Sequence, residues 1–120
     1  MTLQECYSAL GGDYDAVLSR LRNEKLIEKF LLRFPDDDSY ELLRRSLAEG
    51  DQAEAFRGAH TLKGVCQNLG LDRLYTSGAA LCEALRYELR PNVPDLFRQV
   101  EADYAATTAA IRAYQAALDA

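Results

Sequence analysis

The 120-residue chain has little histidine, cysteine or proline, and it has no tryptophan. Its one histidine limits any metal site to a single imidazole, whereas histidine-based sites usually combine several side chains. The three cysteines (Cys6, Cys66 and Cys82) are an odd number without C-x-x-C spacing, so they favour neither a disulfide scaffold nor a zinc ribbon. We therefore expect no bound metal and no cofactor.

Several sequence motifs of enzymes are also missing. The chain has no G-x-x-x-x-G-K-[ST] loop and no G-x-G-x-x-G after a strand, which argues against a bound nucleotide. No G-x-S-x-G elbow is present to carry a serine nucleophile, although one histidine would suffice for a triad. We therefore predict a protein that is not an enzyme in its own right.

Basic residues are fewer than acidic ones, with 14 Lys and Arg against 19 Asp and Glu, for a net charge of −5. This balance argues against a nucleic-acid partner, which would require a basic face. No apolar run approaches the roughly 20 residues of a membrane span, and the first residues do not resemble a signal peptide. With 48% apolar residues, the sequence predicts one cytoplasmic domain over residues 1–120, free of the membrane.

Residue patterns typical of helices occur along the whole chain. No stretch alternates between apolar and polar residues with the period of two that a β-strand would show. Capping residues, glycines and prolines divide the apolar pattern into segments. The expected helical segments are 2–10, 13–21, 23–34, 36–49, 51–69, 72–89 and 94–118. Because the connections are short, consecutive long helices should be antiparallel. We predict an all-α, up-and-down antiparallel four-helix bundle with one or two short N-terminal helices. It should be monomeric, since the long helices can bury their apolar stripes against one another.

The segment 51–69 places the only histidine opposite its apolar stripe. At about 100° per residue, one side of this helix gathers Ala55, Ala59, Leu62, Cys66 and Leu69. His60 falls on nearly the opposite side, so its imidazole should be exposed midway along a rigid helix. Its neighbours on that face are Ala53, Phe56, Arg57, Lys63, Gly64 and Gln67.

Four of these neighbours suggest a function for the face. Gly64 costs about 1 kcal/mol relative to alanine inside a helix, and it removes the side chain that would stand beside His60. Another molecule could therefore approach the ring closely. Lys63 and Arg57 place cations near the ring, where they can attract an anion. Phe56 adds an exposed apolar patch without an obvious internal partner, so we expect it to take part in docking.

The chemistry of this face favours accepting a group over catalysis. An imidazole with a pKa near 6.5 is substantially neutral at cytosolic pH and can act as a nucleophile. On its own helix, no acidic residue lies within one turn of His60 to orient the ring. The cations would attract a negative group such as a phosphoryl.

The residues Ala59-His60-Thr61-Leu62-Lys63-Gly64, followed by Asn68-Leu69-Gly70, resemble the signature of histidine-containing phosphotransfer (HPt) domains. The helix order over nearly the whole chain is also similar, including the acidic, leucine-rich segment 36–49. Proteins of this family are intermediate carriers in multistep His-Asp phosphorelays. The H-x-x-K-G core with its downstream N-L-G is quite specific.

This resemblance implies a role for each residue of the face. His60 would carry the phosphoryl group, on Nε2, while Lys63 would support the phosphate charge. Gly64 would leave room for the partner. The implied partners are receiver domains of response regulators and a hybrid sensor histidine kinase. They would dock on the face around His60 and on adjoining residues of the 72–89 segment, with Phe56 and Gln67 among the docking residues.

One position departs from the family pattern. Many members have a polar side chain, often glutamine, on the next helix, 22 residues after the histidine in some. Here that position is Cys82. Gln67 or Glu83 could take over the ring-orienting contact, or the ring could be oriented differently.

The leading hypothesis is therefore a phosphorelay carrier that accepts a phosphoryl group on His60 from one receiver and passes it to another. A regulatory adaptor that binds a receiver or kinase without being phosphorylated is an alternative, although such a protein would be expected to lack the histidine. A third possibility is the phosphotransfer region of a larger histidine kinase, and the Met1 start favours a free-standing protein over it.

Overall fold

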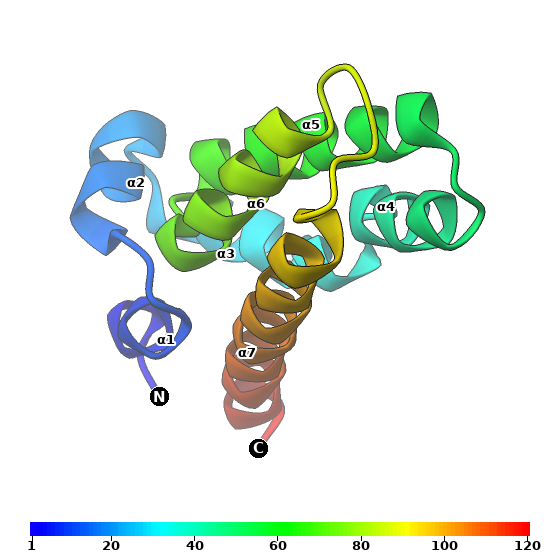
Figure 1. The fold of residues 1–120 in the computed structure, drawn as a ribbon. Coiled ribbons are helices and arrows are strands. Elements are labelled where there is room, and N and C mark those ends of the chain that lie inside the picture. The colour runs from blue at the N-terminus through cyan, green and yellow to red at the C-terminus, as the bar shows by residue number, and fades with distance from the viewer.

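The computed structural model covers residues 1–120 and is entirely helical, as the sequence predicts. Seven α-helices and one 3₁₀ turn follow one another without a strand (Figure 1). They are α1 (Leu3–Leu10), α2 (Tyr14–Leu21), α3 (Glu24–Arg33), the 3₁₀ turn (Phe34–Asp36), α4 (Ser39–Ala48), α5 (Gln52–Leu69), α6 (Asp72–Ala84) and α7 (Val93–Asp119).

The bundle is built by consecutive packing of α4 on α5, α5 on α6 and α6 on α7. Three short helices precede it, because Pro35 separates α3 from α4 with a 3₁₀ turn. Helix α1 packs against the long α7, so both ends of the chain meet on one side of the molecule (Figure 1). The result is a scaffold in which α5 is held from both sides by α4 and α6.

Local signals explain most helix ends. The Thr2 hydroxyl accepts from the Glu5 backbone N–H at 3.0 Å, and the Glu5 carboxylate accepts from the Thr2 N–H at 2.8 Å. Helix α5 ends at Gly70, whose φ of 68° is the left-handed conformation that glycine adopts at little cost. Its start uses Asp51, whose carboxylate accepts from the Glu54 N–H at 3.2 Å. These contacts fix the length and position of the helix that carries His60.

The segment 72–89 is shorter than predicted. Helix α6 ends at Ala84, and the Gln52 side chain donates to the Leu85 carbonyl at 2.6 Å, which satisfies one of the carbonyls left free at that helix end. Leu89 lies beyond this end and is 44% exposed. Leu71 holds the N-terminal cap position of α6, and Asp72 is its first helical residue.

Gly58 on α5 allows a close approach to α4. A Cβ atom added there would lie 2.8 Å from the backbone nitrogen of Leu43 on α4. No side chain can occupy that space unless the helices separate. Gly58 therefore sets the distance between α4 and α5.

A ladder of aromatic rings closes the bundle between α4 and α7. The rings of Tyr40 and Tyr104 are stacked with centroids 3.8 Å apart, and Phe97 stacks on Tyr40 at 6.1 Å. Phe34 in the 3₁₀ turn approaches Tyr104 at 5.8 Å. Stacked aromatic side chains bury large apolar areas. These rings therefore hold α4, the first helix of the bundle, against α7, the last.

All three cysteines are free and buried. Burial raises the pKa of the Cys6 thiol to about 11 and that of the Cys66 thiol to about 12, with Asp37 adding to the shift at Cys66. In the unfolded chain these thiols would ionise near pH 9.0. The folded state therefore keeps protons that the unfolded state loses above that pH.

This difference predicts how stability depends on pH. Because the raised pKa values belong to the folded state, their contribution is complete below pH 9 and is lost as the pH rises toward 11 to 12. The free energy of unfolding, measured by urea titration at a series of pH values from 8 to 10.5, should decrease as the pH rises. The decrease should be shallower in a Cys66→Ala variant. An equal slope in the two proteins would show that this thiol does not contribute.

Candidate functional site

His60 is exposed on α5, opposite the side that faces the core. The five residues of the predicted apolar stripe are all at most 4% exposed. Neither ring nitrogen of His60 has a hydrogen-bond partner within the chain, and the ring lies beside Phe56 with centroids 5.9 Å apart. The imidazole is therefore open to another molecule and is carried by a helix packed on both sides.

Gly64, one turn from His60, borders open space. A Cβ atom added there would meet no atom within 4 Å, in contrast to Gly58 on the same helix. Internal packing thus gives no reason for a glycine at this position, which a larger residue could occupy with better helix propensity. The bare backbone instead leaves the surface beside the imidazole unobstructed.

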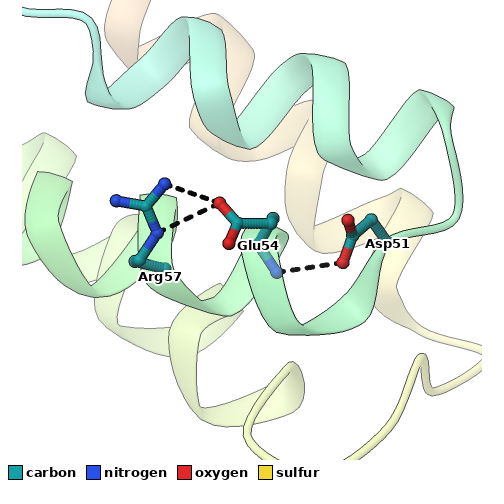
Figure 2. Close-up of polar contacts among 3 residues, drawn as sticks. All are labelled: Asp51, Glu54 and Arg57. Carbon is teal, nitrogen blue, oxygen red and sulfur yellow. Dashed lines mark hydrogen bonds and ion pairs between the residues drawn. The ribbon is translucent and has the colours of Figure 1, made fainter.

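The two cations predicted near the ring differ in their partners. Lys63 is partly buried and forms no ion pair, so its charge is not neutralised within the chain. Arg57 is exposed and paired with Glu54, whose Oε2 lies 3.0 Å from Nε and 2.6 Å from Nη2 (Figure 2). Glu54 also uses its backbone N–H to bind Asp51, so the first turn of α5 and Arg57 form one polar chain. Lys63 is therefore the freer of the two cations.

Sequence reasoning missed a third cation, Arg86, which follows the end of α6. Its guanidinium carbon lies 5.5 Å from the centre of the Phe56 ring, which is itself next to the His60 ring. Phe56 was expected to be exposed without an internal partner, but it is half-buried against the core and covered by Arg86. No sequence pattern reveals this contact, because it depends on how α5 and α6 pack.

Cys82 is buried on α6 and does not replace the expected polar residue. Burial raises the pKa of its thiol, while the positive charges of Lys63 and Arg86 act in the opposite direction. Lys63 acts on Cys82 from α5, and Arg86 acts on it from just after the end of α6. Glu83 makes no hydrogen bond to His60 and instead forms an ion pair with Arg86, with Oε2 at 3.1 Å from Nε.

Gln67, two turns beyond His60, is exposed, and its side chain makes no hydrogen bond. The chain contains no cluster of three or more His, Cys, Asp or Glu side chains that could hold a metal ion. None of its helices is long and apolar enough to cross a membrane. The candidate site therefore consists of one exposed imidazole, three cations on or beside the same face, and an unobstructed surface.

The family model of the Hpt domain matches residues 25–117, and the chain belongs to this family. Hpt domains take part in phosphotransfer in two-component signalling, where they interact with receiver domains and act as phosphocarriers rather than catalysts. No curated protein and no solved structure matches the chain.

Proposed function

We propose that residues 1–120 act as one Hpt domain whose His60 carries the phosphoryl group of a relay. His60 accepts it from the aspartyl phosphate of one receiver domain, such as that of a hybrid histidine kinase, and passes it to the aspartate of a second receiver. The observation that carries this proposal is the exposed His60 ring with no internal partner, beside the open backbone of Gly64.

The transfer requires little from this chain beyond position and charge. The unprotonated nitrogen of the neutral imidazole attacks phosphorus in line with the aspartyl oxygen. As the P–N bond forms, the P–O bond to aspartate breaks, and the aspartate leaves as a carboxylate. The second transfer reverses these changes on another receiver. Any Mg²⁺ and the acidic groups that bind it would be supplied by the receiver.

The cations of the face stabilise the phosphorylated state. Lys63, three residues after His60, has no carboxylate partner that would have to be displaced. Arg57 and Arg86 are each held by one carboxylate on an exposed surface, where solvent screening leaves such pairs weak. A phosphoryl group with about two negative charges competes well with a single carboxylate for them.

The test is phosphoryl transfer between purified proteins. A panel of receiver domains is labelled with ³²P on aspartate, mixed with the protein, and followed by gel electrophoresis over seconds to minutes. At least one receiver should transfer label to the protein, and a second, unlabelled receiver should then remove it. If receivers bind tightly while no acid-labile phosphate forms, the regulatory adaptor is the better description.

The Arg86–Glu83 pair predicts opposite effects of two neutral substitutions. Arg86→Gln should slow the labelling of His60 by phosphoramidate, a small donor that needs no receiver, by up to about fivefold. Glu83→Gln should accelerate it by a similar factor, because it frees Arg86 from its carboxylate.

Arg44→Gln provides the matched control. Arg44 pairs with Glu41 in the same i,i+3 arrangement, but on α4 and outside the face. Its replacement should leave the labelling rate unchanged. Equal rates in Arg86→Gln and the unmodified protein would remove Arg86 from the site.

A further inference from the structure

A polar hollow of about 260 Å³ adjoins the His60 face at the C-terminal end of α5. It is lined by Gly64, Gln67 and Asn68 of α5 and by Arg20 of α2. Helix α2 lies at one end of the bundle (Figure 1), and residue 20 precedes the range that the family model matches. The match therefore assigns nothing to this arginine.

Arg20 is fixed in place but keeps most of its donors free. Its Nη2 donates to the carbonyl of Gln67 at 2.8 Å and to that of Asn68 at 3.1 Å. Its Nε and Nη1 make no hydrogen bond within the chain, and the guanidinium forms no ion pair. In this respect it differs from Arg57 and Arg86, which are each bound to a carboxylate.

The charge of Arg20 makes the C-terminal end of α5 electrostatically positive. The last carbonyls of a helix carry a partial negative charge, which would repel an anion. Arg20 binds two of them and places a full positive charge over the same spot. The side-chain amides of Gln67 and Asn68 have no partners within the chain, and no carboxylate lines the hollow. The hollow thus offers the donors of an arginine and two amides to a hydrogen-bond acceptor.

The position of the hollow indicates which molecule would fill it. Gly64 is four residues and Asn68 eight residues after His60, about 6 and 12 Å along the helix axis. An interface of ordinary size, about 800 Å² on each partner, extends over this distance in any complex that covers His60. A partner centred on the imidazole would therefore also reach the hollow.

We propose that Arg20 and this hollow bind a carboxylate side chain of the docked receiver domain and so help to select which receiver engages the protein. This inference rests on the proposed function, because it assumes that a receiver covers His60. Arg20 is a docking residue in this proposal and takes no part in the transfer itself.

The experiment uses the receiver that labels the unmodified protein fastest in the panel described above. Arg20→Gln keeps an amide that can donate to the α5 carbonyls but removes the charge, and it should weaken receiver binding about tenfold in titration calorimetry. Arg20→Lys keeps the charge and should retain most of the affinity. Arg112→Gln, the matched control, removes an exposed and unpaired cation of α7 and should have no effect.

A second readout separates docking from structural support of α5. Labelling of His60 by phosphoramidate should be the same in Arg20→Gln as in the unmodified protein. Unchanged receiver affinity in Arg20→Gln, an equal loss in Arg112→Gln, or a matching loss of phosphoramidate labelling would each overturn the inference. If no receiver labels the unmodified protein at all, the proposed function itself fails.

Discussion

Replacing His60 by glutamine should abolish the acid-labile phosphate that a labelled receiver transfers to the protein. Glutamine preserves much of the size and polarity of the side chain, but its amide nitrogen is not a nucleophile. Because the ring is exposed and makes no internal hydrogen bond, the substitution should leave the thermal unfolding midpoint almost unchanged.

Receiver binding provides the control for this variant. The affinity of His60→Gln for the receiver, measured by titration calorimetry, should remain close to that of the unmodified protein, since the docking face is otherwise intact. Stoichiometric label on His60→Gln would show that another residue accepts the phosphoryl group.

Replacing Gly64 by leucine should increase stability and greatly reduce transfer. Leucine has a better helix propensity by nearly 1 kcal/mol, and a Cβ at this position meets no atom within 4 Å. The free energy of unfolding should therefore rise by up to about 1 kcal/mol. The same side chain projects into the space through which a receiver reaches His60, so transfer from a receiver should slow by about 100-fold, the effect expected of a disrupted interface centre.

Gly58 offers the opposite case on the same helix. Gly58→Ala places its Cβ 2.8 Å from the Leu43 backbone, and overpacking of this kind costs about 1–3 kcal/mol. The unfolding midpoint of Gly58→Ala should fall, while phosphoramidate labelling of the remaining folded protein continues.

If Gly64→Leu accepted phosphate from a receiver at the normal rate, Gly64 would not serve partner access.

Much of this arrangement follows from the sequence because it depends on local periodicity. The 3.6-residue repeat and the capping residues predict the helices, and the apolar stripe of α5 correctly places His60 on the exposed side. The absence of any side chain at Gly64 is also visible directly. For these features, neighbours along one helix determine the result.

The remaining features depend on contacts between helices, which periodicity does not encode. Arg86 reaches Phe56 only because the end of α6 packs beside α5, and Arg20 reaches the end of α5 from a separate helix. The end of α6 depends on Gln52, 33 residues before Leu85. Even on one helix, the pairing of Arg57 with Glu54 was not anticipated, because either cation of the face could have been the free one.

The identity of the phosphorylated atom tests the central claim most directly. The protein can be labelled uniformly with ¹⁵N, phosphorylated by its receiver and studied by ³¹P and ¹H–¹⁵N NMR. A phosphorus resonance with one-bond coupling to an imidazole nitrogen is expected, and since the chain has one histidine, that signal assigns the group to His60. A resonance from phosphorus bonded to oxygen, together with unchanged imidazole signals, would contradict the account.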